Sequence, residues 1–173
     1  MAFDTLPSPY DPGIRTDPRM EKFIIEGGTP LSGTVVPAGN KNAALPALAA
    51  TLLTVEEVVL RNVPRIRDVE AMIELLVRLG AKAEWRDENV VAVCCDEVDN
   101  TEVDDAWSER IRASFLLAGP LLARFGMADM PPPGGDVIGR RRLDPHLDAF
   151  RALGATVEAN RSYRLSAPAG LRA

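Results

Sequence analysis

Two segments of this chain follow the same order, in which an apolar helical pattern ends at a Leu-Gly-Ala tripeptide and an extended run comes next. The first is RLGAKAE at residues 78–84, and the second is RALGATVE at residues 151–158. Glycine commonly terminates helices, and a second extended run follows each first one, so both segments predict a helix followed by a hairpin. A duplicated unit of this kind predicts an α+β fold in which the helices pack against each other and the sheets lie outside; the alternative is that Leu-Gly-Ala recurs by coincidence, since glycine often ends helices.

The remaining elements are predicted from local patterns. Apolar residues at helical spacing predict helices at 42–53, 69–79, 105–124 and 144–153, the third interrupted at Gly119-Pro120. Runs of strand composition between turn residues predict strands at 22–26, 32–36, 57–61, 81–85, 90–93, 127–130, 155–158 and 163–166. The N-terminal run, residues 1–20, is rich in Pro, Asp and Ser and lacks an apolar period, which predicts a disordered leader.

The size and composition of the chain indicate one soluble globular domain. It has 173 residues, of which 46% are hydrophobic, and this is enough to bury a core. The longest nearly apolar run, residues 43–53, is far shorter than the roughly 20 residues that span a bilayer. The N-terminus also lacks the basic-then-apolar pattern of a signal peptide. We therefore expect a cytoplasmic protein with no membrane partner.

Cysteine usage, histidine usage and charge argue against three classes of function. Cys94 and Cys95 are adjacent, so they offer neither a disulfide framework nor a Cys-x-x-Cys motif. The single histidine, His146, excludes a multi-histidine metal site. The formal net charge of -5 argues against general nucleic-acid binding, which needs a basic surface. Any cluster of basic residues is then a local feature of the protein.

A turn of small residues runs into an apolar helix at residues 39–46, GNKNAALP, and leaves Lys41 at the junction. Asn40 or Asn42 can cap this helix, because a short side-chain oxygen accepts a hydrogen bond from a first-turn amide. Pro46 fits near a helix start, where its missing amide costs little, so the helix is expected to begin near Asn42. Free amides, the helix dipole and the Lys41 ammonium then favour a phosphate or a carboxylate. The alternative is an ordinary capped helix with a solvated lysine.

Two further stretches carry arginines. Arg112 lies in a helix-forming segment beside Ile111 and Phe115, where an arginine usually pairs with a carboxylate or points to water and less often binds a ligand. The loop at residues 131–146, PPPGGDVIGRRRLDPH, displays Asp136 and then three consecutive arginines. Because guanidinium groups match phosphate oxygens in planar, forked geometry, this loop suggests a polyanionic small ligand, with a solvated basic turn as the alternative.

Taken together and in order, these motifs resemble those of the UDP-N-acetylglucosamine enolpyruvyl transferases, the 1-carboxyvinyltransferases of peptidoglycan precursor synthesis. The resemblance runs from about Glu21 to Leu165. It rests on GNKNAALP at 39–46, NVP at 62–64, DV at 68–69, IRAS at 111–114, GPL at 119–121, ARFG at 123–126, PGG at 133–135, IG at 138–139 and LGA at 153–155. The related shikimate-pathway enolpyruvyl transferases are a poorer match, because NKNAAL is typical of the sugar-nucleotide branch. The resemblance implies an inside-out α/β fold of repeated units, with helices inside and sheets outside.

The resemblance also implies a reaction. Phosphoenolpyruvate adds to the 3-hydroxyl of UDP-N-acetylglucosamine through a tetrahedral intermediate, phosphate leaves, and neither a metal nor an organic cofactor takes part. This chemistry needs cations for the anionic groups of both substrates and an acid that protonates the methylene carbon.

The matching motifs assign residues to these tasks. Lys41 would hold phosphoenolpyruvate, with Asn42 beside it at the sugar, and Arg112 and Arg141 would clamp anionic groups where the two substrates meet. Asp68 aligns with another family acid in the active-site region. The uridine diphosphate side would be lined by Arg141, Arg142, Leu143, Asp144 and Pro145, with His146 nearby.

Asp136 is where this sequence departs from the family pattern. Most of the family carries at this position a cysteine that donates a proton and is alkylated by the epoxide antibiotic fosfomycin, and some members carry aspartate. An aspartic acid can donate a proton if partial burial raises its pKa toward neutrality, but it is a poor target for alkylation. We therefore expect Asp136 to be the general acid and the activity to be insensitive to fosfomycin, the alternative being a loop aspartate that caps its own turn. Arg142, where the family usually has proline, is a second departure.

The resemblance implies enzymes more than twice this long, whose second domain supplies an aspartate base and further basic groups. On this reading, residues 1–20 are the leader, residues 21–37 are edge strands on the side of the second domain, and residues 38–173 are a partial catalytic domain made of two repeats. We expect this chain alone not to turn over, because an open half-site neither excludes water nor supplies the base.

Two other classes of function stay open. One is a non-catalytic module that binds the UDP-sugar or pairs with a partner, and the other is an inactive gene remnant. The joint presence of Lys41, Arg112, Asp136 and Arg141 favours the transferase, because a pure scaffold needs none of them.

Overall fold

Both predicted repeats are present in the structure, a computed structural model that describes residues 27–28, 30, 32–135 and 142–172. The first repeat contains α1 (Lys41–Ala50), the 3₁₀ helix η1 (Thr51–Leu53), β1 (Val58–Arg61), α2 (Arg67–Arg78), β2 (Lys82–Asp87) and β3 (Val90–Cys94). The second contains α3 (Asp105–Ser108), the 3₁₀ helix η2 (Arg112–Leu117), α4 (Ala118–Phe125), β4 (Met127–Met130), α5 (Asp144–Ala152), β5 (Thr156–Ala159) and β6 (Tyr163–Ser166). All of these elements belong to one compact unit, Val36–Ala173.

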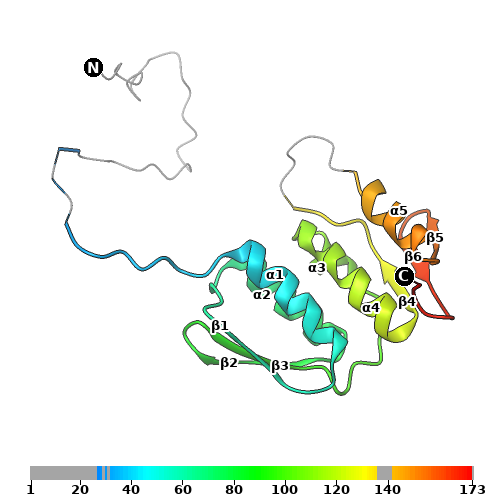
Figure 1. Ribbon diagram of the computed structural model, residues 1–173, viewed down its shortest axis with the longest axis horizontal. Helices are drawn as coiled ribbons and strands as arrows, with labels where there is room; N and C mark the ends of the chain where they lie inside the picture. Colours follow the sequence, from blue (N-terminus) through cyan, green and yellow to red (C-terminus); the bar gives the residue numbers. More distant parts are fainter. Residues whose placement is uncertain (1–26, 29, 31, 136–141, 173) are drawn as a thin grey trace, which may run out of the picture. The chain divides into compact units, whose positions relative to one another are not determined.

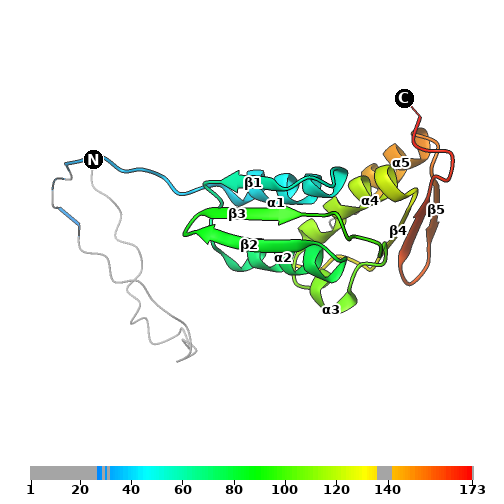
Figure 2. The ribbon, with the colours of Figure 1, turned by 90° about the horizontal axis from the view of Figure 1, so that it is seen from below.

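The two repeats share one topology. Each has a three-stranded antiparallel sheet whose last strand lies in the middle, in the order β1-β3-β2 and β4-β6-β5. A helix connects the first strand of each sheet to the following hairpin, α2 in the first repeat and α5 in the second. The helices α1 and α2 cover one face of the first sheet, and α4 lies between them and the second sheet (Figure 1 and Figure 2). The α+β fold with helices inside and sheets outside is therefore confirmed.

The Leu-Gly-Ala tripeptides end the two equivalent helices with the same hydrogen bonds. In the first repeat, Gly80 N–H donates to Val77 O at 3.0 Å and Ala81 N–H donates to Leu76 O at 3.0 Å. In the second, Gly154 N–H donates to Arg151 O at 3.0 Å, and the next amide donates five residues back in the same way. Both glycines have positive φ, 105° and 88°, as this helix-ending motif requires. The sequence repeat is thus a structural repeat.

The helix α2 illustrates how the apolar period builds the core. It was predicted at 69–79 and is observed at Arg67–Arg78, and Val69, Met72, Leu75 and Leu76 on its apolar face are fully buried, whereas Val77 is 42% exposed. Its opposite face carries charged side chains, including Asp68 in the first turn. Within the described ranges of the chain, no helix is long and apolar enough to cross a membrane.

The prediction of a single long helix at 105–124 is wrong. The chain instead forms α3, η2 and α4, and the break falls at residues 109–111 rather than at Gly119-Pro120. Ile111 is extended, with φ -139° and ψ 137°, and the buried hydroxyls of Ser108 and Ser114 hydrogen-bond across the break at 2.9 Å. The Gly-Pro pair lies in the first turn of α4, where proline needs no amide partner. This break exposes the residues on either side of Ile111 to the functional site described below.

The helix α1 also differs from its prediction. It begins at Lys41, one residue earlier than expected, and continues after Ala50 as η1 to Leu53. Pro46 is the sixth residue of the helix rather than near its start, so the Asn42 carbonyl lacks its α-helical amide donor. The helix persists because Leu45 and Leu48, on its inner face, are 5% and 0% exposed, so tertiary packing outweighs the proline.

The structure shows no strand at residues 32–36, so the strand predicted there is wrong. Val35 and Val36 are 90% and 85% exposed, so this segment has neither the buried face nor the paired neighbour that a strand needs. The strand predicted at 22–26 lies outside the described residues.

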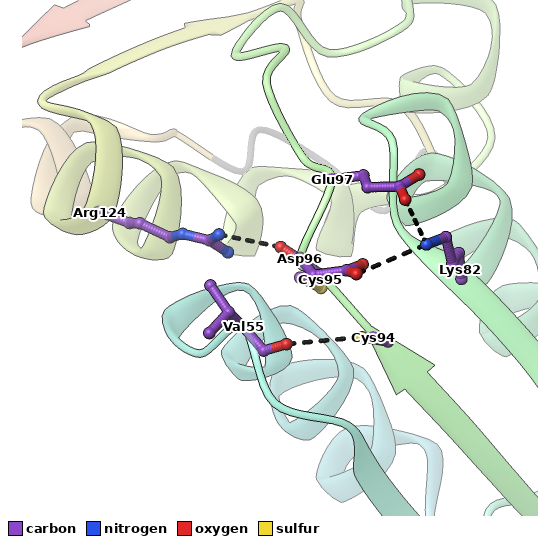
Figure 3. Close-up of polar contacts among 7 residues, drawn as sticks. All are labelled: Val55, Lys82, Cys94, Cys95, Asp96, Glu97 and Arg124. Carbon is purple, nitrogen blue, oxygen red and sulfur yellow. Dashed lines mark hydrogen bonds and ion pairs between the residues drawn. The ribbon is translucent and has the colours of Figure 1, made fainter.

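One hydrophobic core joins the two repeats. It includes fully buried side chains from both, such as Leu52, Leu76, Leu121 and Leu165. Arg124, on α4 of the second repeat, adds a polar connection to the first repeat by donating to Leu52 O at 2.9 Å, Thr54 O at 3.4 Å and Cys95 O at 2.9 Å. Figure 3 shows its side chain reaching to the backbone that follows β3.

Candidate functional site

A cavity of about 250 Å³ lies where the N-terminus of α1, the first turn of α2 and the break before η2 meet. We call it the Lys41 cavity. It is lined by Lys41, Asn42, Leu45, Asp68, Arg110, Ile111, Arg112, Ala113 and Gly135. Three of these side chains are cationic and one is anionic, so the cavity carries a local excess of positive charge within an acidic chain.

The α1 terminus positions Lys41 through its cap. Asn40 caps the helix, because its side-chain oxygen accepts a hydrogen bond from Asn42 N–H at 2.7 Å. Asn40 was one of the two residues predicted as the cap, and this prediction is confirmed. Gly39 lies directly against the end of β1, since a Cβ atom there would be 1.8 Å from Asn62 O. Only glycine allows this approach, which brings the α1 terminus and Lys41 close to the first turn of α2.

Lys41 forms an ion pair with Asp68, from the first turn of α2. Both side chains are partly exposed, 48% for Lys41 and 35% for Asp68. Such a pair is weak in water and can exchange for another anion with little loss of free energy. Asp68 therefore both orients the ammonium and competes with any anionic ligand for it.

Arg112 opens η2 on the other side of the cavity. Its Nη2 donates to Arg142 O at 3.3 Å, which connects it to the residue that precedes Leu143 and α5. Gly134 and Gly135 pack against the same segment, because Cβ atoms on them would lie 1.6 Å from Glu109 O and 3.0 Å from Arg112 N. The two glycines thus bring the loop that follows β4 against the wall of the cavity.

Five of the residues assigned by resemblance to the uridine diphosphate side, at 142–146, lie at the start of α5, and none of these five is among the residues that line the Lys41 cavity. Leu143 is 7% exposed, and the His146 ring is 5.9 Å from the Phe115 ring, centroid to centroid. Arg142 forms a double hydrogen bond with Asp144, with both distances at 2.8 Å. This guanidinium holds the pKa of the Asp144 carboxyl below its ordinary value. Pro145 occupies the first turn of the helix and is exposed.

The predicted site residues are therefore only partly assembled in the described chain. Lys41, Asn42, Asp68 and Arg112 come together in one cavity. The loop residues Asp136 and Arg141 lie outside the described residues. Gly135, which immediately precedes Asp136, lines the cavity.

The sequence reasoning missed Arg110. This residue lines the Lys41 cavity and also an adjoining groove of about 850 Å³, which shares Asp68 with it. The signal that could have identified it is Arg-x-Arg beside a helix break, with an aromatic residue, Trp107, three positions earlier. Because the helix break was predicted at Gly119-Pro120, the sequence did not indicate that Arg110 lies beside a break.

Comparison with solved structures defines the class of this architecture. The chain matches the crystal structure of the enolpyruvyl transferase NikO from Streptomyces tendae with a TM-score of 0.68 and 26% sequence identity, over 83% of this chain and 32% of that one. The fold is therefore part of an enolpyruvyl transferase fold. A family model described as EPSP synthase (3-phosphoshikimate 1-carboxyvinyltransferase) matches residues 25–170. The chain belongs to this family of 1-carboxyvinyltransferases.

Curated relatives place the chain within the family. It is 52% identical over 147 residues to the UDP-N-acetylglucosamine 1-carboxyvinyltransferase of Bradyrhizobium diazoefficiens, covering 85% of this chain and 34% of the relative. The enzyme of the same name from Treponema denticola is 47% identical over 144 residues, covering 83% and 34%. The resemblance to the sugar-nucleotide branch is thus confirmed as homology. The chain spans about a third of the length of these relatives.

Proposed function

We propose that this chain contributes the phosphoenolpyruvate-binding part of an enolpyruvyl transferase that acts on UDP-N-acetylglucosamine in peptidoglycan precursor synthesis. The observation that carries the proposal is the meeting of Lys41 and Arg112, distant in sequence, in one small cationic cavity of a chain homologous to enzymes of that name. A cavity of about 250 Å³ suits a small metabolite rather than a macromolecule.

The proposed chemistry is acid-assisted addition followed by elimination. The methylene carbon of phosphoenolpyruvate takes a proton while the sugar 3-hydroxyl oxygen bonds to the adjacent carbon, and the hydroxyl proton is lost. Loss of phosphate and of a methyl proton from the tetrahedral intermediate then restores the double bond. Lys41 and Arg112 would hold the phosphate and carboxylate throughout, and their fixed positive charge would stabilise the charge that develops during reaction.

Asp136 is proposed as the acid that protonates the methylene carbon. It follows Gly135, a residue of the cavity wall, directly in the chain. Its carboxyl can serve only if its pKa is raised toward neutrality, which burial beside a bound substrate would favour despite the neighbouring cations. The proposal predicts an enzyme that fosfomycin does not alkylate.

The sugar nucleotide is proposed to extend from the cavity toward the start of α5. Asn42 would face the sugar, and Arg141 would hold phosphate groups jointly with Arg112. Arg142, Leu143, Asp144 and Pro145 would line the uridine diphosphate side, with His146 nearby. The hydrogen bond from Arg112 to Arg142 O supports this direction, because it connects the cavity to that segment.

A first experiment measures phosphate release from phosphoenolpyruvate in the presence and absence of UDP-N-acetylglucosamine. We expect no turnover from the 173-residue chain alone and sugar-dependent release when it is joined to the remaining two thirds of the Bradyrhizobium diazoefficiens relative. In that hybrid, Lys41→Ala should lower the rate about a hundredfold or more. Arg61→Gln, an exposed arginine on β1, is the matched control and should leave the rate unchanged. A hybrid that folds yet releases no phosphate, or a Lys41→Ala hybrid with the full rate, would contradict the proposal.

Asp136 is tested in the same hybrid with fosfomycin. We expect the hybrid carrying Asp136 to keep its rate after incubation with the antibiotic, whereas Asp136→Cys should stay active and become inactivated. Asp136→Asn should be inactive because an amide cannot donate the proton. Inactivation of the Asp136 protein as fast as of the cysteine variant would refute the assignment.

A non-catalytic module that binds the UDP-sugar is the second candidate, because the same cationic side chains of the Lys41 cavity would serve binding without turnover. Calorimetric titration of the chain with UDP-N-acetylglucosamine tests it. Binding by the chain together with a hybrid that never turns over would favour the module.

A further inference from the structure

We propose that Arg110 is a further anion-binding residue of the Lys41 cavity and that Trp107 is the positioning residue that holds it there. The inference rests on the proposed function and deepens it. The ligand group is a phosphate or a carboxylate, whether carried by phosphoenolpyruvate or free as inorganic phosphate.

The indole of Trp107 is a fixed platform. Its backbone N–H donates to Asp104 Oδ1 at 2.9 Å, which caps α3, and its half-buried ring packs against the core. The Arg78 guanidinium lies 5.5 Å from the ring centroid and is itself anchored by Glu74 at 2.9 Å and Asp104 at 3.2 Å. The ring therefore has contacts to α2 as well as to its own helix and cannot swing freely.

Arg110 lies over this platform. Its guanidinium carbon is 3.9 Å from the Trp107 ring centroid, which is a close cation–π contact. A guanidinium carries five N–H donors, and a cation–π contact is not a hydrogen bond to an acceptor atom. The contact thus restricts the Arg110 side chain and leaves N–H donors for other partners.

Those donors are available to a ligand. Across the described parts of the chain, no carboxylate lies within 4.0 Å of the Arg110 guanidinium, and its side chain donates no hydrogen bond there. The other cations of the cavity differ, since Lys41 pairs with Asp68 and Arg112 donates to Arg142 O. Arg110 lies on the wall of the same cavity with its charge uncompensated by these residues.

The charge of the ligand also calls for a third cation. Phosphoenolpyruvate carries a carboxylate and a phosphate, about -3 at neutral pH. Lys41 and Arg112 against Asp68 supply a net charge of only +1, and Arg110 raises this to +2. A partly enclosed site strengthens such charges relative to open water, so the third cation should contribute measurably to affinity.

The experiment titrates the 173-residue chain with phosphoenolpyruvate and, separately, with inorganic phosphate, and follows heat. Arg110→Gln should weaken binding of both probes roughly tenfold, as expected for loss of one charge-assisted contact, and should flatten the dependence of affinity on salt. Arg61→Gln is the matched control, because it removes an exposed arginine on β1 that lines none of the cavities described here. Thermal unfolding of each variant checks that the fold is kept.

Trp107 is tested by a conservative pair. Trp107→Phe keeps an aromatic face for Arg110 and should retain most of the affinity, whereas Trp107→Leu should weaken it about threefold or more. In the Arg110→Gln background, the same two substitutions should no longer differ. A purely structural tryptophan would give the same difference in both backgrounds.

The outcomes separate this inference from the proposed function. If the parent chain binds phosphoenolpyruvate and Arg110→Gln binds equally well with the same salt dependence, the role of Arg110 is refuted and the proposed function stands. If the folded parent chain binds neither probe, the cavity is not an anion site and both fail. Tenfold weakening by Arg110→Gln together with the Trp107 pattern supports the inference, whatever the hybrid enzyme does.

Discussion

The two neighbouring cysteines show how far the environment of single residues can differ. Cys95 is fully buried and its sulfur lies 3.7 Å from the Thr51 hydroxyl, whereas Cys94 is half-buried and donates to Val55 O at 3.5 Å (Figure 3). Burial raises the pKa of the Cys95 thiol above its ordinary value of 9.0. The two thiols, adjacent in the sequence, should therefore react differently.

A thiol reagent at pH 8 should modify Cys94 quickly and Cys95 only when the protein unfolds, because the thiolate is the reactive form. The raised pKa also means that the folded state prefers the protonated Cys95 thiol. Its contribution to stability is thus fully present below pH 9.0 and is lost as the pH rises through the higher folded value. Peptide mapping after labelling and urea unfolding at several pH values test both statements. In Cys95→Val, the alkaline loss of stability should be smaller, and equal labelling of both cysteines in the folded chain would be incompatible with this account.

At the scale of elements, the two helix-ending glycines are equivalent in sequence but not in surroundings. A Cβ atom on Gly80 would lie 2.9 Å from Glu97 O, whereas one on Gly154 would meet only Arg172 side-chain carbons, at 3.8 Å or beyond. Gly154→Ala should lower the free energy of unfolding by about 1–2 kcal/mol, the cost of positive φ in a residue with a side chain. Gly80→Ala should cost at least about 1 kcal/mol more, because the backbone must shift. Urea denaturation measures both, and equal losses would show that the Glu97 contact does not matter.

The proline inside α1 gives a second prediction for an element. Pro46 is exposed and lies in the helix interior, so Pro46→Ala restores a hydrogen bond to the Asn42 carbonyl and removes a steric conflict. We expect the free energy of unfolding to rise by about 1–2 kcal/mol, after allowing for the greater freedom of the unfolded chain. Pro120→Ala in the first turn of α4 is the control, with no gain expected because no amide is needed there. A loss of stability in Pro46→Ala would mean that the ring has a packing role.

At the scale of the whole molecule, Arg124 connects the two repeats through three backbone carbonyls of the first. Arg124→Met should lower the free energy of unfolding by about 2–4 kcal/mol, since charge-assisted hydrogen bonds are lost and part-buried carbonyls are left unpaired. Arg164→Met, which removes the exposed pair with Asp129 within the second sheet, should cost about 1 kcal/mol or less.

The two tryptophans provide the measurement, because Trp85 lies on β2 of the first repeat and Trp107 on α3 at the start of the second. Single-tryptophan variants should report one coincident urea transition, as expected when both repeats share one core. Separate transitions for the two probes would show that the repeats unfold independently and that Arg124 does not couple them.

Much of the fold could be predicted because its signals are local. The hairpins, the apolar period of α2 and the Leu-Gly-Ala helix ends all depend on residues within a few positions of each other. The break before η2 could not, because it depends on a hydroxyl contact between Ser108 and Ser114 and on the close approach of Gly134, which arrives from a later loop. Pro46 inside α1 was likewise misjudged, because burial of Leu45 and Leu48 outweighs its local cost.

The candidate site divides in the same way. The sequence alone determined the repeated unit, the lysine beside a helix cap at residues 39–42 and the arginine at 112. It also determined membership of the enolpyruvyl transferase family. These features could be recognised because sequence motifs and apolar periods involve residues that are close together in the chain. Only the tertiary structure decided that Asp68 pairs with Lys41, that Arg112 contacts the segment before α5, and that Trp107 supports Arg110 at the same cavity. These relations depend on how α1, α2 and the broken segment before η2 pack around one core, and packing between distant segments leaves no pattern along the sequence.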